Sequence, residues 1–207
     1  PISACLGLLP LYLGTPRRIS AYLSKSPISS ASLSSANATA AKGAIERAKL
    51  DPEVIDAIYF GNVLQTSKDA VYIARHVGLK AGAPERAPAI TLNRACASGL
   101  DAIIEGAKAL RAGDAEVVLA GGAENMSMTP YAMRGVRNGW KMIRSDVDDM
   151  LFSSLYDPMA GCSIGETVEY LAAELDIDRA SADEAAVWSQ TRAAEAQAAG
   201  HLDEEIV

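Results

Sequence analysis

The sequence has few residues of the kinds that build metal sites or disulfide frameworks. Its 207 residues include three cysteines and two histidines, and neither kind shows the paired spacing of a zinc site. An odd number of cysteines fits a reducing compartment better than a disulfide scaffold, and the cytoplasm is the simplest such location. We therefore expect a cytoplasmic protein with no metal ion.

Positive charge and long apolar runs are also scarce. A net charge of −7 argues against nucleic acid as the main partner, because phosphate binding needs a basic surface. No apolar run reaches the roughly 18 residues that span a bilayer, so we expect no membrane segment. Residues 2–13 are mostly apolar, but Arg17 and Arg18 follow them, whereas a signal peptide carries its positive charges before its apolar core. These residues are predicted to form a buried first strand.

Helix and strand patterns alternate over the first 120 residues. Helices are predicted at 37–50, 67–79 and 98–112, and strands at 55–63, 88–92 and 116–120. Such alternation predicts an α/β fold with a mostly parallel sheet and helices on its faces. The pattern changes after Gly122, where a long irregular excursion is followed by predicted helices at 166–175 and 181–199, the second capped by Ser181.

Cys96 lies at the junction between a predicted strand and a predicted helix. Apolar residues recur downstream at the spacing of one helix face, with Ser98 expected as the N-cap and Gly99 allowing close approach to the backbone. The partial positive charge at a helix N-terminus stabilises a thiolate over a thiol. Cys96 is therefore a candidate nucleophile, and the alternative is a small apolar residue packed at a strand end.

Two segments around Cys96 carry motifs. They are Asn93-Arg94-x-Cys96-x-Ser98-Gly99 and the downstream run Gly121-Gly122-Ala123-Glu124-Asn125-Met126-Ser127 with Pro130. Together they closely resemble the nucleophile region of the thiolases, which condense or cleave acyl groups carried on coenzyme A (CoA). Further segments similar to this family are 61–65, 164–169 and 186–190, and residues 69–80 resemble the mitochondrial-type 3-ketoacyl-CoA thiolases and their bacterial relatives.

The resemblance extends from about Ala36 to the last residue. Before it, residues 20–35 are half serine and do not match the family's opening strand. A segment so rich in serine buries little apolar surface and is predicted to be loop or disorder.

The resemblance implies a role for particular residues. In this family a first cysteine takes the acyl group as a thioester and a second cysteine moves a proton at the acetyl-CoA carbon, which divides one difficult substitution into two easier steps. Cys96 matches the acyl-accepting nucleophile, and its own backbone N–H would help to hold the thioester oxygen. Ser163, Ile164 and Gly165 match the family's usual His-Met-Gly segment and are assigned to substrate binding. Cys162 is expected to be structural.

The resemblance covers the N-terminal part of the family. It implies a thiolase-like layered α/β fold, with a βαβαβ nucleophile domain in residues 1–122 and the start of the loop domain over the CoA site in residues 123–207. The family's later Gly-His-Pro histidine, second reactive cysteine and asparagine motif have no match in the 207 residues, and His76 and His201 stand in other contexts. We therefore expect these residues alone to be a poor catalyst.

The implied function is that of an acyl-CoA acyltransferase that forms or cleaves 3-ketoacyl-CoA. Its implied partners are acyl-CoA or CoA as substrate and further copies of the chain in a homo-dimer or homo-tetramer, with no separate cofactor. The alternative from another class is a non-catalytic acyl-CoA or lipid-carrier module on the same scaffold. A ketoacyl synthase is the weaker reading, because its nucleophile segment lacks the Asn-Arg pair that precedes Cys96 here.

A row of basic residues offers a further candidate contact. Arg134, Arg137, Lys141 and Arg144 would share one stripe if residues 131–145 were helical. The stripe could contact a CoA phosphate or a partner subunit, and the alternative is a solvated face.

Overall fold

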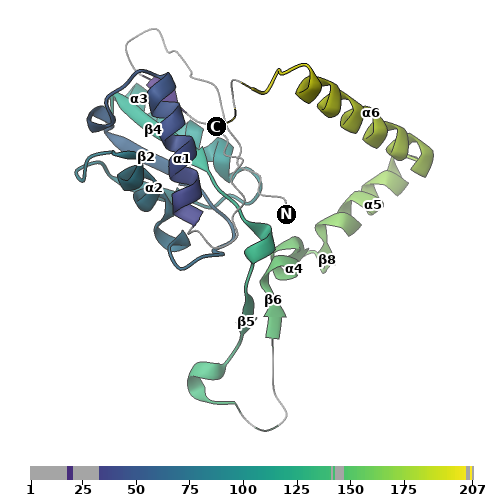
Figure 1. Cartoon of the computed structure of the whole chain (residues 1–207). Helices are drawn as coiled ribbons and strands as arrows, with labels where there is room; N and C mark the ends of the chain where they lie inside the picture. Colours follow the sequence, from purple (N-terminus) through teal and green to yellow (C-terminus); the bar gives the residue numbers. More distant parts are fainter. Residues whose placement is uncertain (1–17, 21–32, 141, 143–146, 204–205, 207) are drawn as a thin grey trace. The chain divides into compact units, whose positions relative to one another are not determined.

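The computed structural model describes residues 18–20, 33–140, 142, 147–203 and 206 (Figure 1). The chain forms two compact units, one comprising Pro1–Thr129 with Glu205–Val207 and the other Pro130–Glu204. Among the described residues, no helix is both long and apolar enough to cross a membrane.

The first unit is built on a parallel sheet of four described strands in the order β1-β4-β2-β3. The strands are β1 (Arg18–Ser20), β2 (Ala57–Gly61), β3 (Ala89–Leu92) and β4 (Val117–Gly122). The predicted α/β architecture with a parallel sheet is confirmed. The register brings the carboxyl ends of three strands together, because Gly61 pairs with Leu92 on one side and with Gly122 on the other.

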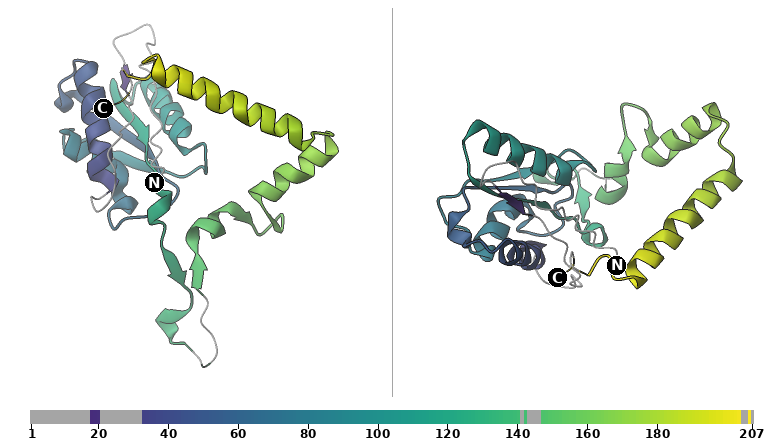
Figure 2. Two further views of the ribbon diagram at one scale, coloured as in Figure 1. Left: turned by 45° about the vertical axis from the view of Figure 1, so that its right-hand side comes forward. Right: turned by 90° about the horizontal axis from the view of Figure 1, so that it is seen from above.

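Three helices cover the two faces of this sheet (Figures 1 and 2). They are α1 (Leu33–Arg47), α2 (Ile73–Ala81) and α3 (Ser98–Ala112). Side chains alternate along β2, so that Ile58 and Phe60 pack with α1 and α2, whereas Tyr59 packs with α3. The apolar spacing of α3 predicted one buried face, and the structure buries Ile103 and Leu110 of it but leaves Leu100 and Ile104 exposed. The sheet therefore lies between two helical layers.

The serine-rich segment differs from its prediction at its end. Helix α1 begins at Leu33 and so includes Ser34 and Ser35. Leu33 and Ser34 are buried, and the Ser34 hydroxyl accepts a hydrogen bond of 2.6 Å from Lys80 Nζ. A serine is tolerated in a helix once its hydroxyl has such a partner. The predicted strand at 2–13 and the part of the serine-rich segment from 21 to 32 lie outside the described residues.

The second unit consists of two short antiparallel strand pairs and three α-helices among its described residues. The pairs are β5 (Tyr131–Met133) with β6 (Val147–Asp149) and β7 (Tyr156–Asp157) with β8 (Cys162–Ser163). The helices are α4 (Met150–Leu155), α5 (Ile164–Glu174) and α6 (Arg179–Ala198). The two long predicted helices of this region are thus present.

In the second unit the structure does not meet the condition set for the basic stripe, and the predicted cap of one helix was wrong. The segment 131–145 is not one helix, because β5 is followed by a short 3-10 turn, η4 (Val136–Asn138), between Gly135 and Gly139, whose φ angles are 77° and 79°. Backbone in the left-handed region ends a helix. Helix α6 is capped by Asp178, whose carboxylate accepts from the backbone N–H of Ser181, so Ser181 lies inside the helix.

Candidate active site

Cys96 lies in a tight turn between the end of β3 and the start of α3, and its side chain is exposed. Asn93 begins the turn, because its Oδ1 accepts from the backbone N–H of Ala95 at 3.1 Å. Ala95 then adopts a φ of +47°, a conformation that costs an L-residue about 1–2 kcal/mol. Among the described residues the Cys96 thiol is thus exposed, and it follows a residue with a strained backbone.

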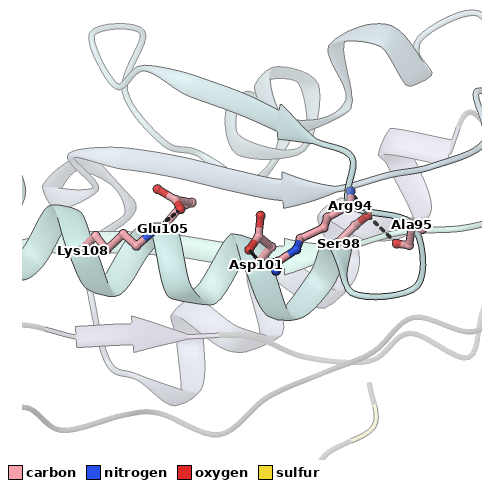
Figure 3. Close-up of polar contacts among 6 residues, drawn as sticks. All are labelled: Arg94, Ala95, Ser98, Asp101, Glu105 and Lys108. Atoms are coloured by element: carbon pink, nitrogen blue, oxygen red, sulfur yellow. Dashed lines mark hydrogen bonds and ion pairs between the residues drawn. The ribbon is translucent and has the colours of Figure 1, made fainter.

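Ser98 closes the same turn through its hydroxyl (Figure 3). Its Oγ accepts from the backbone N–H of Arg94 at 2.8 Å and donates to the carbonyl of Ala95 at 2.6 Å. The expected role of Ser98 as N-cap was wrong, since Ala97 occupies the cap position and Ser98 is the first residue of α3. A capping hydroxyl bonds forward into its helix, whereas this one bonds back to the residues that precede Cys96.

An ion pair extends from the turn along α3. Arg94 Nη1 lies 2.7 Å from Asp101 Oδ1, in the first turn of the helix (Figure 3). The Arg94 side chain is largely exposed, so the pair contributes less than about 1 kcal/mol. Its effect is to hold the guanidinium along the helix, while the Asp101 carboxylate interacts favourably with the helix N-terminus.

The first turn of α3 rests directly on the backbone of the strands. A Cβ placed on Gly61 would lie 2.5 Å from the carbonyl carbon of Ser98 and 2.6 Å from the backbone nitrogen of Gly99. A Cβ on Gly122 would lie 3.3 Å from the Cα of Gly99. The close approach expected at Gly99 is therefore made possible by Gly61 and Gly122, because a Cβ on Gly99 itself would meet nothing within 4 Å.

A half-buried carboxylate joins the loops that follow β2 and β4. Glu124 Oε2 accepts from the backbone N–H of Val63 and Oε1 from that of Leu64, each at 2.9 Å. Asn62 Nδ2 donates to the carbonyl of Ala123 at 2.8 Å and lies 3.3 Å from Glu124 Oε1. Burial raises the pKa of Glu124, and the hydrogen bonds from Val63 and Leu64 oppose that rise.

Asn62 and Glu124 lie in two of the segments that resemble the family, but the sequence motifs do not by themselves predict that the two residues pair. A signal was available, because both residues come just after the glycines that end two buried strands. Parallel strands that neighbour each other place such residues at one edge of the sheet. The same rule that located Cys96 would have located this pair.

The turn presents two groups that could act on a carbonyl compound. One is the exposed thiol of Cys96. The other is its backbone N–H, which no hydrogen bond among the described residues uses. A free N–H beside a nucleophile is the arrangement that stabilises a developing oxyanion.

The other predicted site residues lie in the second unit. Ser163 caps α5 by a capping box, since its Oγ accepts from the N–H of Glu166 and the Glu166 carboxylate accepts from the N–H of Ser163. These bonds lower the pKa of Glu166. Ile164 begins α5 with its side chain half exposed, and Gly165 follows it. Cys162 is buried on β8, in keeping with a structural role.

The structure does not support the basic stripe. Arg134 pairs with Asp148, Arg137 lies in η4, and Lys141 and Arg144 fall outside the described residues. In the part of the chain that the structure describes, no cluster of three or more histidine, cysteine or acidic side chains is arranged to hold a metal ion.

The sequence is similar to known proteins of one family. Residues 18–207 match the family described as thiolase, N-terminal domain. The chain belongs to the thiolase family. It is 44% identical over 168 residues to the mitochondrial 3-ketoacyl-CoA thiolase of Rattus norvegicus, a match that covers 81% of this chain and 42% of that protein. It is also 44% identical over 167 residues to an acetyl-CoA acetyltransferase of Cupriavidus necator, covering 80% of this chain and 42% of the relative.

Solved structures give the same result for the fold. A crystal structure of human mitochondrial 3-ketoacyl-CoA thiolase in complex with CoA matches with a TM-score of 0.81 and 41% identity, over 84% of this chain and 45% of that one. The acetyl-CoA acetyltransferase of Bacillus anthracis matches with a TM-score of 0.76 and 35% identity, over 81% of this chain and 42% of that one. This thiolase chain thus spans less than half the length of these relatives.

Proposed function

We propose that Cys96 accepts an acyl group from acyl-CoA in a thiolase-type acyl transfer that forms or cleaves 3-ketoacyl-CoA. The single observation that carries this proposal is the exposed Cys96 thiol just before α3, together with its own backbone N–H, which no hydrogen bond between described residues uses. The family match supports acyl transfer to CoA as the reaction class. The human relative was solved in complex with CoA, which supports CoA esters as the class of substrate.

The proposed step is a substitution at a thioester. The Cys96 thiolate attacks the carbonyl carbon of acyl-CoA and forms a new carbon–sulfur bond, while the bond from that carbon to the CoA sulfur breaks. The proton lost from the Cys96 thiol is balanced by the proton that the departing CoA takes up. During the attack, the Cys96 N–H donates to the carbonyl oxygen, and one such donor contributes about 3 kcal/mol to stabilising the transition state.

Substrate binding by Ser163, Ile164 and Gly165 remains a proposal. The apolar side chain of Ile164, half exposed at the start of α5, is suited to contact an acyl chain. The capping box of Ser163 would fix the direction in which α5 begins.

Assembly and location are proposals as well. We propose a homo-dimer or homo-tetramer in which β3 takes part, because β3 is one of the two edge strands of the described sheet and Ile90 on it is exposed. A cytoplasmic location stays a prediction. Several relatives are mitochondrial thiolases, so cell fractionation is the experiment that tests this location.

Incorporation of labelled acetyl groups tests the proposed function. The protein is incubated with acetyl-CoA that carries a labelled acetyl group, and the label retained per chain is counted after gel filtration. We expect Cys96→Ala to abolish retention and Cys162→Ala to leave most of it, because Cys162 is buried. Acetyl-CoA that binds without covalent retention in the wild type would favour the alternative, a non-catalytic acyl-CoA carrier.

A further inference from the structure

Backbone hydrogen bonds connect the carboxyl ends of β2, β3 and β4 next to the start of the Cys96 turn. The backbone N–H of Asn62 donates to the carbonyl of Leu92 at 2.9 Å, which ties the end of β2 to the end of β3. The N–H of Ala123 donates to the carbonyl of Gly61 at 2.9 Å, which ties the end of β4 to β2. The segment 61–62 is therefore bonded to both of its neighbours.

The side chains of Asn62 and Glu124 complete this connection. Glu124 accepts two backbone N–H groups of the loop after β2, and the Asn62 amide donates across to Ala123. The Asn62 side chain is 4% exposed, and its Oδ1 has no partner among the described residues, so its NH₂ group alone holds it. One carboxylate thus accepts from two successive N–H groups of the loop after β2.

Both ends of the Cys96 turn depend on that path. On the strand side, the turn leaves β3 at Leu92, whose carbonyl is bonded to Asn62. On the helix side, Ser98 and Gly99 rest against Gly61. A shift of residues 61–62 would thus move the first and last residues of the turn together. Glu124 could therefore influence Cys96 through residues 61–62 without a direct hydrogen bond to it.

We propose that Glu124, acting with Asn62, is a positioning residue for Cys96. It holds the loop after β2, and through it the turn that orients the thiol and the N–H of Cys96. The proposal rests on the proposed function in one respect, namely that Cys96 is the reactive group.

The pKa and the two acceptor oxygens of Glu124 indicate a role in positioning the loop rather than in raising the free energy of unfolding. Burial is the largest influence on its pKa and raises it, so ionisation of this carboxylate is less favourable in the fold than in water. Of the uncharged side chains, none of similar size offers two acceptor atoms to two adjacent N–H donors. The group thus supplies a geometry that an amide cannot reproduce.

The test compares Glu124→Gln with Glu116→Gln in the full chain. The first substitution replaces one acceptor oxygen by an NH₂ donor that faces a backbone N–H. The second makes the same chemical change on an exposed residue just before β4 and serves as the matched control. Acetylation of Cys96 by acetyl-CoA is followed by mass spectrometry, and amide hydrogen exchange is measured for the peptide that contains residues 93–99.

For Glu124→Gln we expect the rate constant of Cys96 acetylation at saturating acetyl-CoA to fall about tenfold or more, because small misplacements of reacting groups have effects of this size. The half-saturating concentration should stay within about twofold, because the substitution leaves the substrate contacts in place. Exchange in residues 93–99 should become faster in this variant alone. A purely structural role would lower the fraction of protein that reacts and leave the rate constant unchanged.

An unchanged rate constant with unchanged exchange in Glu124→Gln would overturn the proposal. If that variant does not fold, Glu124→Asp decides the question, since it keeps both acceptor oxygens on a shorter side chain and should react at an intermediate rate. A wild-type rate in Glu124→Asp would likewise contradict the proposal. If the wild type itself is not acetylated, the proposed function fails, while the exchange measurement still tests whether Glu124 positions the turn.

Discussion

Replacing Gly61 with alanine should displace the turn that carries Cys96. The new Cβ would lie 2.5 Å from the Ser98 carbonyl carbon, 2.6 Å from the Ser98 carbonyl oxygen and 2.6 Å from the Gly99 nitrogen. All three atoms belong to the backbone, so the contacts cannot be relieved by turning a side chain. Either β2 or the first turn of α3 must move, and overpacking of this kind costs about 1–3 kcal/mol.

Thermal unfolding followed by circular dichroism measures this cost. For a chain of this size, about 1–3 kcal/mol corresponds to a fall in melting temperature of roughly 2–12 °C. The matched control is Gly99→Ala, because a Cβ on Gly99 meets nothing within 4 Å and alanine is favoured over glycine inside a helix by about 1 kcal/mol. Gly99→Ala should therefore be neutral or stabilising. A Gly61→Ala protein as stable as the wild type, with unchanged labelling of Cys96, would refute the claim that α3 is packed against Gly61.

Three further predictions concern the turn, its support and the second unit. Ala95→Gly should stabilise the protein by up to about 1 kcal/mol in urea unfolding and Ala95→Val should destabilise it, because the φ of +47° strains a side chain; the reverse order would contradict the strain. The raised folded-state pKa of Glu124 means that its contribution to stability is present below its ordinary value of 4.5 and is lost as pH rises through the folded-state pKa. The free energy of unfolding of the wild type relative to Glu124→Gln should therefore be higher near pH 4 than at pH 7, and an equal or opposite difference would show that the hydrogen bonds from the loop outweigh burial. Ile164→Ala should raise the half-saturating concentration of a long-chain acyl-CoA more than that of acetyl-CoA in the labelling assay, and equal effects would remove Ile164 from the acyl-chain site.

The sequence predicted α3 and its neighbours well because their signals are local. Helix α3 runs over Ser98–Ala112 as predicted, since its apolar spacing is typical of a helix and Gly113, with a φ of 84°, ends it. The parallel sheet followed from the alternation of strands and helices. The place of Cys96 between β3 and α3 followed from the same pattern.

Other features depended on contacts that local patterns do not contain. Serine is a residue type that often caps helices, which is why Ser98 was expected to be the N-cap. In the structure its hydroxyl instead bonds back to Arg94 and Ala95, because the turn folds these residues against the start of α3. The start of α1 in the serine-rich segment depends on the partner that Lys80 gives to Ser34, far away in the sequence. The Glu124 hydrogen bonds to Val63 and Leu64 span about sixty residues, so the sequence could at most place Glu124 at the same sheet edge as Asn62 and not predict these bonds.

The most direct test of the central claim is to locate the acyl group on the wild-type protein. The protein is incubated with acetyl-CoA, digested at acidic pH to preserve thioesters, and mapped by tandem mass spectrometry, with a parallel sample treated with hydroxylamine. The account predicts an acetyl group on Cys96 that hydroxylamine removes, as it does for a thioester. An acetyl group on Cys5 or Cys162 with none on Cys96 would contradict it.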